Sequence, residues 1–441
     1  MMTHEEATKI LYKNGIIFDP NLNISQFGGL EVFIKFLEKG NFRKRLEDQF
    51  GFYKARTLMQ IIIGIVAGAK CMNDIGKVAK DPLVIKYLKN PVEEAQLGRD
   101  VRSFSREQIE SFHDFNMSLS ILDFLQRVPQ SEELIFDVDA TSAEKYGSQE
   151  GVEKGYVGQD QPESCYQYLL FRLHNRNSFL YGTIRGGAAH SQNDFCGYLQ
   201  RFLPMLKAKW RTTWRADSGY FNEMAFDLFM ENDADFFIKA PMSESRLNLA
   251  QTSPDLNWTV EKDNVSFASR VTTTKKGNNY REVFKRTRLQ TQGQLSLGDI
   301  ASFRYDCLAT SNLVIEESEA FLFYNGRANI ENNIRELKND YSLGKIVTDD
   351  FNANDVITQA TMLTYLLMRH FQNELLPETM KKHVLSTLRN HVFNIPALFR
   401  KGQRKLFLKI KNVFHDDLAY AYILNRLQKF LSWVLSPPQM A

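Results

Sequence analysis

The stretch LIFDVDAT, residues 134–141, decides the fold class of this chain. Its apolar residues alternate with acids, and a period of two is typical of a β-strand, whose side chains point to alternate faces. From residue 1 to about 130 the apolar residues instead return every three or four positions, which is the pattern of amphipathic helices. We therefore expect a helical N-terminal segment followed by a sheet that begins at this stretch.

Strands and helices alternate after this first strand. Strands are predicted in YQYLLFRLHN, SFLYGTIRGG, TTWRADSGY and DFFIKA, and helices in NDFCGYLQRFLPMLK and FNEMAFDLFMENDA. Three strands in succession, followed by helix, strand, helix and strand, predict an α/β domain with a mixed sheet flanked by helices. From about 241 to 311 the helical pattern disappears, and short strand-like pieces separated by polar residues predict a β-rich insertion.

These changes of pattern divide the chain into five predicted segments. They are a helical N-terminal domain (1–130), the first part of the core (131–240), the β-rich insertion (241–311), the second part of the core (312–390) and a basic C-terminal segment (391–441). The C-terminal segment is expected to hold a strand in RKLFLKIKN and a closing helix in DDLAYAYILNRLQKFLSWV.

The composition is that of a soluble globular protein. The chain has 441 residues, of which 43% are hydrophobic and 24% charged, so it can bury a large core. Its net charge is only +3, so a nucleic-acid surface requires local segregation of charge. Residues 381–411 carry nine Lys or Arg and no acid, and residues 270–288 carry seven against one Glu. Such runs are usually solvated faces, but two of them favour a polyanionic partner.

The cysteines and the apolar runs bear on the compartment. Four cysteines lie scattered without CxxC spacing, which argues against a zinc knuckle and a secreted disulfide framework and fits a reduced cytoplasm. The apolar run 61–69 is too short to span a bilayer, and the N-terminus lacks a signal-peptide pattern. We expect neither export nor membrane insertion.

Acidic residues of three elements lie where an α/β sheet would place a ligand site. Asp137 and Asp139 project from one face of the first strand, Asp217 ends a later strand, and Glu331 lies on a predicted helix after the insertion. Each Asp has a structural alternative, in which it caps the following turn or helix. Ligands bind outside the carboxyl ends of strands in open α/β sheets. Three carboxylates there suit two Mg²⁺ or Mn²⁺ ions, which activate an oxygen nucleophile in phosphodiester chemistry.

The stretch YNGRANIENNIRELK, residues 324–338, places charges on one helical face. Arg327, Glu331, Arg335 and Lys338 fall within roughly 80° of one another at about 100° per residue. A solvated face stitched by i,i+4 ion pairs is one interpretation of this pattern. A metal-binding acid surrounded by phosphate-binding bases is the other.

This second stretch carries a resemblance to a known family. Tyr324, Arg327, Glu331 and Lys338 match at every fixed position the signature Tyr-x2-Arg-x3-Glu-x6-Lys, which belongs to a subgroup of the DDE transposases of bacterial insertion sequences. LIFDVDAT resembles that family's first block, in which the catalytic Asp precedes a Thr by two positions, and this favours Asp139 over Asp137. WRADSGYF resembles the second block and gives Asp217. The resemblance covers about residues 130–345 well, including the β-rich insertion.

The resemblance implies a ribonuclease-H-like core and a function. Catalytic Asp139, Asp217 and Glu331 would hold two Mg²⁺ ions per site, with Mn²⁺ as a substitute. The reaction would be metal-dependent cleavage of transposon ends and strand transfer into target DNA, by cut-and-paste, in a homodimeric complex with double-stranded DNA. Terminal inverted repeats would be read by the N-terminal helical domain. The protein would be cytoplasmic and associated with the nucleoid when bound to DNA.

Further residues are predicted to bind DNA. In the family, the basic residues and the Tyr of the signature grip phosphates near the scissile bond, and a guanidinium pairs bidentately with phosphate. A tryptophan in the insertion could stack on a flipped base, although a core position is the more frequent role of a lone Trp. The predicted DNA-binding residues are Tyr324, Arg327, Lys338, Arg335, Trp258, Lys275, Lys276, Arg286 and Arg288.

Two other functions stay open. A transposase-derived regulator would bind DNA ends without cutting them, but a binder has no need of three mutually repelling carboxylates. A stand-alone metal nuclease would cut DNA without joining it. The sequence has no Gly-x-Ser-x-Gly elbow, Cys/His constellation or Walker-type loop, which argues against side-chain nucleophiles and nucleotide hydrolysis.

Overall fold

The computed structural model describes residues 23–156, 162–190, 192, 194–262, 264–289, 303–401, 406–410 and 417–429. These residues fall into two compact units. The first unit combines the residues up to Val101 with those from His370 onward, and the second runs from Arg102 to Arg369. The candidate acids all lie in the second unit.

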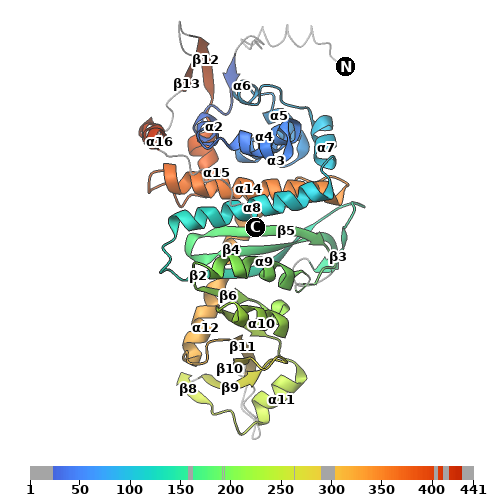
Figure 1. Cartoon of the computed structure of the whole chain (residues 1–441), viewed down its shortest axis with the longest axis vertical. Coiled ribbons are helices and arrows are strands. Elements are labelled where there is room, and N and C mark those ends of the chain that lie inside the picture. The colour runs from blue at the N-terminus through green and yellow to red at the C-terminus, as the bar shows by residue number, and fades with distance from the viewer. Residues whose placement is uncertain are drawn as a thin grey trace, which may run out of the picture. The chain divides into compact units, whose positions relative to one another are not determined.

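The first unit is mainly helical and also carries a small sheet (Figure 1). Its helices are α2 (Leu30–Lys39), α3 (Phe42–Phe50), α4 (Phe52–Ala67), α5 (Met72–Val78), α6 (Pro82–Leu88), α7 (Glu94–Arg102), α15 (Leu385–Leu388) and α16 (Asp417–Lys429). The strands β1 (Ile24–Ser25), β12 (Ala397–Lys401) and β13 (Leu406–Ile410) form an antiparallel three-stranded sheet. The predicted C-terminal strand and helix correspond to β13 and α16.

The apolar run near residue 61 belongs to α4, whose residues from Thr57 to Ala67 are buried. Gly68 ends α4 with φ of 110°, a left-handed conformation that favours glycine, so α4 and α5 are separate helices. Among the described residues no single helix is long and apolar enough to cross a membrane. The pair α4 and α5 passes that test by length and composition only, and it is bent by 91°.

The second unit is built on a mixed sheet of ten strands in the order β3-β4-β2-β6-β7-β11-β10-β9-β8, with β5 paired to β4. Strands β2, β6 and β7 are parallel to one another, and the other pairs are antiparallel. The strands are β2 (Leu134–Glu144), β3 (Glu153–Tyr156), β4 (Pro162–Leu173), β5 (Ser178–Gly186), β6 (Thr212–Ala216), β7 (Ala234–Ala240), β8 (Thr259–Lys262), β9 (Val265–Thr273), β10 (Asn279–Arg288) and β11 (Phe303–Thr310).

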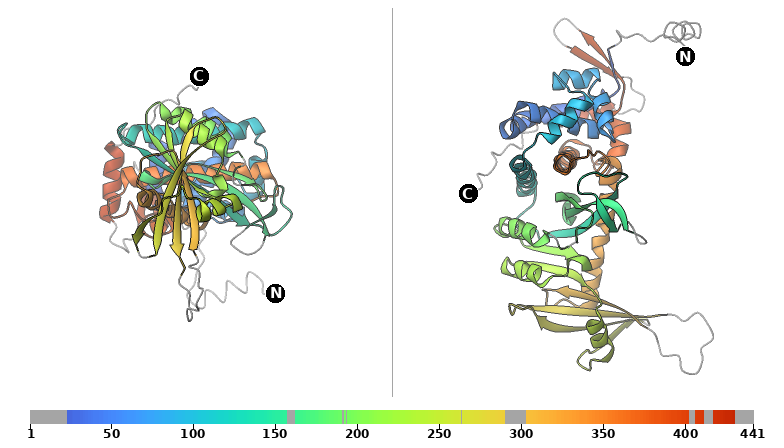
Figure 2. Two further views of the ribbon diagram at one scale, coloured as in Figure 1. Left: turned by 90° about the horizontal axis from the view of Figure 1, so that it is seen from below. Right: turned by 90° about the vertical axis from the view of Figure 1, so that its right-hand side faces the viewer.

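Helices flank this sheet, which confirms the predicted mixed α/β class. They are α8 (Arg106–Arg127), α9 (Phe195–Lys207), α10 (Glu223–Glu231), α11 (Glu244–Thr252), α12 (Glu317–Asn325), α13 (Ile330–Asp340) and α14 (Phe351–Leu375). The right-hand view of Figure 2 shows the green helices α9 and α10 on one side of the strands and the orange helices that follow β11 on the other.

The alternation of β2 explains this layering. Leu134, Phe136 and Val138 are fully buried in the core that α9 and α10 form with the sheet, and Phe136 stacks on Trp214 of β6 at 4.4 Å between ring centroids. The acids at positions 137 and 139 therefore point to the opposite face. That face is the one along which α13 lies, since α13 contacts β2.

The β-rich insertion extends the core sheet. Strand β11 pairs with β7 in antiparallel register, from Cys307 opposite Ala240 to Thr310 opposite Phe237, so β8 to β11 continue the same ladder. Helix α11 was not expected, and the prediction that helices are missing from 241–311 is wrong for Glu244–Thr252. Only Ala250 of this helix is buried, so it has no apolar periodicity to detect, and the Ser243 side chain caps its first turn.

Candidate active site

The register between β2 and β6 brings two of the predicted acids together. Val138 lies beside Ala216 at the end of the parallel pairing, so Asp139 and Asp217 occupy the next position on adjacent strands. Beyond that point β6 gives way to a short turn, Ser218–Tyr220, and the Asp217 side chain accepts a hydrogen bond from the Gly219 backbone N–H at 2.9 Å. The two carboxylates thus lie where the parallel pairing of β2 and β6 ends at its carboxyl side, which is where ligands bind in such sheets.

The pKa of Asp139 reflects its burial and the proximity of Asp217. Burial raises its pKa to about 6, the positive charge of Arg327 opposes the shift, and the negative charge of Asp217 adds to it. Arg327 lies in the turn before α13, and its Nη1 is 3.3 Å from Asp139 Oδ2. Burial also raises the pKa of the Tyr324 hydroxyl. The charges near this hydroxyl include those of Arg327 and Asp217. Four predicted site residues therefore share one neighbourhood.

Asp137 has a different environment although it shares a face with Asp139. It is 0% exposed and lies in register with Arg172 of β4 and Arg215 of β6. Arg172 donates from Nη1 to Asp137 Oδ2 at 2.8 Å, and Arg215 donates from Nε to Oδ1 at 2.7 Å. His174 Nδ1 is 3.2 Å from the same carboxylate. Both oxygens are thus occupied by buried cations, so Asp137 is a structural acid.

The same two arginines hold the helical segment that carries Glu331. Arg215 donates from Nη1 to the Phe323 carbonyl at 2.7 Å, and Arg172 donates from Nε to Asn333 Oδ1 at 2.7 Å. Gly326 packs so closely on Arg215 that a Cβ at that position would lie 2.6 Å from its Nη1. These two arginines were not among the predicted site residues. The signal available was that buried Asp137 needs a cation, since buried carboxylates are normally paired.

A second anchor fixes the far end of α13. The Lys338 ammonium donates to the Ser142 carbonyl of β2 at 2.6 Å. Arg327 before the helix and Lys338 in its last turn therefore both contact β2, at Asp139 and at Ser142. Glu331 lies one helical turn after Arg327, between the two anchors.

Glu331 itself makes no ion pair or side-chain hydrogen bond within the described part of the chain, and it is exposed. The i,i+4 pairs of the solvated-face interpretation do not form, because Arg327 faces Asp139 and Arg335 donates to Asn332 Oδ1 at 2.6 Å. Among the described residues no three Asp, Glu, His or Cys side chains lie close enough together to hold a metal ion. The structure thus brings Asp139 and Asp217 together and leaves the Glu331 carboxylate outside that pair.

The donor set nevertheless fits a hard divalent cation. Asp139 and Asp217 offer only oxygen atoms, and the mutual repulsion that contributes to the raised pKa of Asp139 is what a bound cation would relieve. Glu331 has a carboxylate that is unpaired among the described residues. It lies one helical turn, about 6 Å along the helix axis, after Arg327, whose guanidinium neutralises Asp139.

The predicted basic residues of the insertion do not form one cluster. Lys275 and Lys276 are exposed in the turn between β9 and β10, where Lys276 pairs with Glu231 at 2.7 Å. Arg286 and Arg288 lie at the other end of β10, roughly 20 Å away along the strand. The Arg286 guanidinium carbon lies 4.3 Å from the ring centroid of half-buried Trp258.

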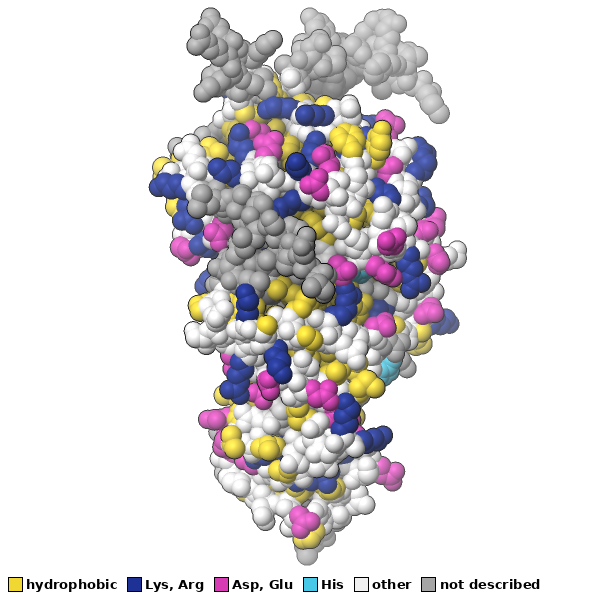
Figure 3. All heavy atoms as spheres, viewed as in Figure 1, with side chains coloured by type: hydrophobic (Ala, Val, Ile, Leu, Met, Phe, Trp, Pro, Cys, Tyr) yellow, Lys and Arg dark blue, Asp and Glu magenta, His cyan; other side chains and the backbone are white. Residues whose placement is uncertain are grey.

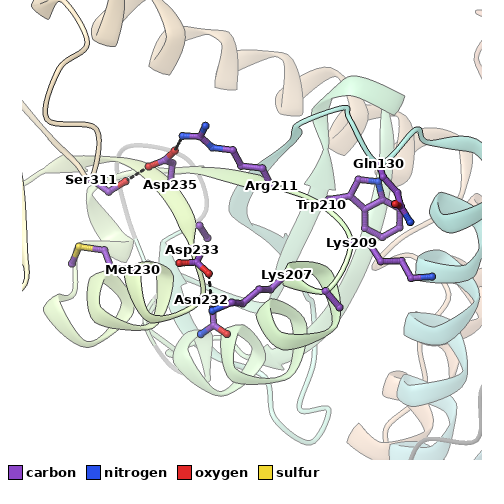
Figure 4. A pocket seen from close by; sticks show the side chains of 12 residues that line it. Gln130, Lys207, Lys209, Trp210, Arg211, Met230, Asn232, Asp233, Asp235 and Ser311 are labelled. Carbon is purple, nitrogen blue, oxygen red and sulfur yellow. Dashed lines mark hydrogen bonds and ion pairs between the residues drawn. The ribbon is translucent and has the colours of Figure 1, made fainter.

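Neither the charged surface nor the pocket at the amino ends of β6 and β7 is a better candidate site than the acids. Lys and Arg are interspersed with Asp and Glu over the face seen in Figure 3. A pocket of about 730 Å³ lies at the amino ends of β6 and β7, at the opposite ends of the strands from Asp217 (Figure 4). Two of its three cations are internally paired, Lys207 with Asp233 and Arg211 with Asp235, each at 2.8 Å. Of the basic run 381–411, residues 402–405 and 411 lie outside the described residues.

Comparisons with known proteins give a family. The family described as transposase DDE domain group 1 matches residues 35–432, which is most of the chain. A solved structure of the piggyBac transposase synaptic complex with hairpin DNA is similar at 9% sequence identity and a TM-score of 0.41, covering 87% of this chain and 77% of that one. A search of curated proteins gives no match.

The chain belongs to the transposase DDE domain group 1 family. This confirms that it carries a DDE transposase domain. The roles of individual residues stay predictions, as do the subgroup defined by the Tyr-x2-Arg-x3-Glu-x6-Lys signature and the bacterial origin.

Proposed function

We propose that this chain is a metal-dependent transposase of a bacterial insertion sequence, in which Asp139, Asp217 and Glu331 are the catalytic carboxylates. The observation that supports this best is the adjacent placement of Asp139 and Asp217 just after the last paired residues of β2 and β6, beside the turn that leads into Glu331. Two acids of a three-acid set meet through strand register alone. The third is carried by a helix that is anchored to the same strand on both sides of it.

Mg²⁺ or Mn²⁺ held by these oxygens would polarise the scissile phosphodiester and activate the attacking water or 3′-hydroxyl. The chain's own residues supply the surroundings. Arg327 neutralises Asp139 in the free protein and is free to turn to a DNA phosphate once a cation takes over that role. A guanidinium is suited to this because it pairs bidentately with phosphate. Lys338, which contacts β2 at Ser142, and Tyr324, which lies near Arg327 and Asp217, add a point charge and a hydroxyl.

The reaction we propose is cleavage at the transposon ends followed by strand transfer into target DNA, by cut-and-paste. The helical first unit would bind the terminal inverted repeats, and the active complex would be a homodimer on two DNA ends in the bacterial cytoplasm. Phosphate contacts would make all of this binding fall steeply with salt.

The decisive experiment compares wild type with Glu331→Gln on a duplex that carries the DNA end flanking the gene, in Mg²⁺ or Mn²⁺. Wild type should nick the end and Glu331→Gln should bind the duplex with unchanged affinity but leave it intact. Glu319→Gln is a matched control, because Glu319 is another exposed glutamate without an ion pair in the neighbouring helix α12. It should cut like wild type.

The outcomes separate the three candidate functions. If wild type and Glu331→Gln both bind and neither nicks, the protein is a DNA-binding regulator. If wild type cuts but joins no 3′ end to a target plasmid, it is a nuclease. Cleavage with joining, lost only in Glu331→Gln, supports the transposase.

A further inference from the structure

Two lysines converge at the end of β2, beyond the candidate acids. Lys145 directly follows β2, and its ammonium donates to the carbonyl of Gly344, in the segment after α13. Lys338 donates to the Ser142 carbonyl three residues earlier. The two segments are closely packed, since a Cβ on Gly344 would lie 2.6 Å from the Ala143 Cβ. Lys145 thus comes from a part of the sequence that no signature covers, and it meets Lys338 only through the fold.

Neither ammonium has an acidic partner. Both donate to neutral carbonyls, and no carboxylate of the described residues lies within ion-pair distance of either one. The neighbouring Cys165 is a neutral thiol, because burial raises its pKa. Glu144 precedes Lys145 but points to the other face of the strand, where it raises the pKa of Tyr146.

The environment of the Lys145 and Lys338 ammonium groups favours the binding of an anion. The pKa of Lys145 is lowered to about 8, mainly by burial, and the charge of Lys338 contributes in the same direction. Burial also lowers the pKa of Lys338. Lys145 is only 8% exposed, and its ammonium lies 5.9 Å from the centroid of the Tyr166 ring. Two partly desolvated cations that repel each other are costly unless an anion joins them.

We propose that Lys145 and Lys338 form a phosphate-binding pair that holds the backbone of a DNA strand along the end of β2, a role that rests on the proposed function. Lys145 shares the face of β2 with Asp139 and follows it by six residues, or about 20 Å. Duplex DNA rises about 3.4 Å per nucleotide, so Lys145 would hold a phosphate about six nucleotides from the one being cleaved, and Lys338, which contacts β2 at Ser142, would hold one nearer to the acids. Lys145 is therefore a DNA-positioning residue that contributes to binding and takes no part in chemistry.

The test measures how the affinity for a labelled duplex carrying the flanking DNA end depends on salt, for wild type and for Lys145→Gln. Gln removes the charge but keeps a donor for the Gly344 carbonyl. Loss of one phosphate contact should reduce the slope of log K against log salt by about 1, whereas Lys145→Arg should keep the slope. Lys338→Gln should lose about 1, and the double variant about 2.

The matched control is Lys207→Gln, because Lys207 already pairs with Asp233 at the opposite ends of the strands. Its slope should equal that of wild type. The slope does not depend on the fraction of folded protein, which shifts log K by a constant, so a less stable variant still gives an answer. Lys145→Met, which keeps only the apolar stem, is a second neutral variant that should match Lys145→Gln.

The possible failures are distinguishable. If wild type binds the duplex and the Lys145 variants lower the melting temperature but keep the slope, Lys145 is only structural and the pair is refuted, while the proposed function stands. If wild type does not bind the duplex at all, the proposed function fails and the phosphate-binding pair fails with it.

Discussion

Arg327 and Asp139 form an ion pair, with 3.3 Å between Nη1 and Oδ2, that joins the turn before α13 to the central strand β2. The contact links the segment that carries Glu331 to the neighbourhood of Asp139 and Asp217. In the free protein the guanidinium occupies the position of a counter-ion to the carboxylate pair.

Replacing Arg327 by Met should therefore destabilise the protein at neutral pH by up to about 3 kcal/mol, because Asp139 would stay charged and largely buried without its cation. Since Arg327 lowers the pKa of Asp139, the variant should also titrate Asp139 at higher pH. Denaturant unfolding at pH 8 and at pH 5 checks both effects. Arg335→Met is the matched control: that exposed guanidinium donates to Asn332, and its loss should change stability by less than about 0.5 kcal/mol.

The titration of Asp139 should be visible as a pH dependence of stability. Its pKa lies near 3.8 in an unfolded chain and at about 6 in the fold, so between these values the folded state binds more protons. The free energy of unfolding should fall as pH rises through this window, by up to about 3 kcal/mol, and the stabilisation present below pH 4 should be lost above pH 6. Asp139→Asn should remove this component. Unfolding curves measured with a chelator present would contradict the assignment if wild type and variant ran parallel from pH 4 to 7.

Replacing Asp137 by Asn and replacing Asp217 by Asn should lower stability by different amounts. Asp137→Asn leaves two buried guanidiniums without their carboxylate, and we expect a loss of about 3–5 kcal/mol. Asp217→Asn should cost less than about 1 kcal/mol, because Asn also accepts the hydrogen bond of a cap. It should nevertheless abolish DNA cleavage. Equal stability of the two variants would show that Asp137 is not the structural acid.

Gly326→Ala tests the close packing between Gly326 and the Arg215 guanidinium. The new Cβ would lie 2.6 Å from Arg215 Nη1, which donates to the Phe323 carbonyl, so the guanidinium must shift. We expect a loss of about 1–3 kcal/mol, together with reduced cleavage, because the adjacent Arg327 would be displaced. Gly197→Ala in α9 is the control, since nothing lies within 4 Å of its Cβ position and Ala is the better helix former. It should be neutral or slightly stabilising in a thermal melt.

Much of the core could be predicted from short-range patterns. The alternation in residues 134–141 predicts β2, and the predicted strands YQYLLFRLHN and SFLYGTIRGG correspond to β4 and β5. The helix Glu244–Thr252 could not be predicted, because a helix with one buried residue has no apolar period. The continuity of the insertion with the core sheet was also hidden, since the pairing of β11 with β7 joins residues about 70 positions apart.

The local residue pattern is enough to show which side chains are available and which face of each element they occupy, because strand and helix periods are local. It placed Asp137 and Asp139 on one face of a strand, and Arg327, Glu331 and Lys338 on one face of a helical segment. The partners of these charges could be known only from the folded chain: Asp137 is neutralised by Arg172 and Arg215, Asp139 lies beside Asp217 and Arg327, and Lys145 lies near Lys338. The physical reason is that strand register and helix docking join segments distant in the chain, and these contacts determine which charge is buried and which remains available to a ligand.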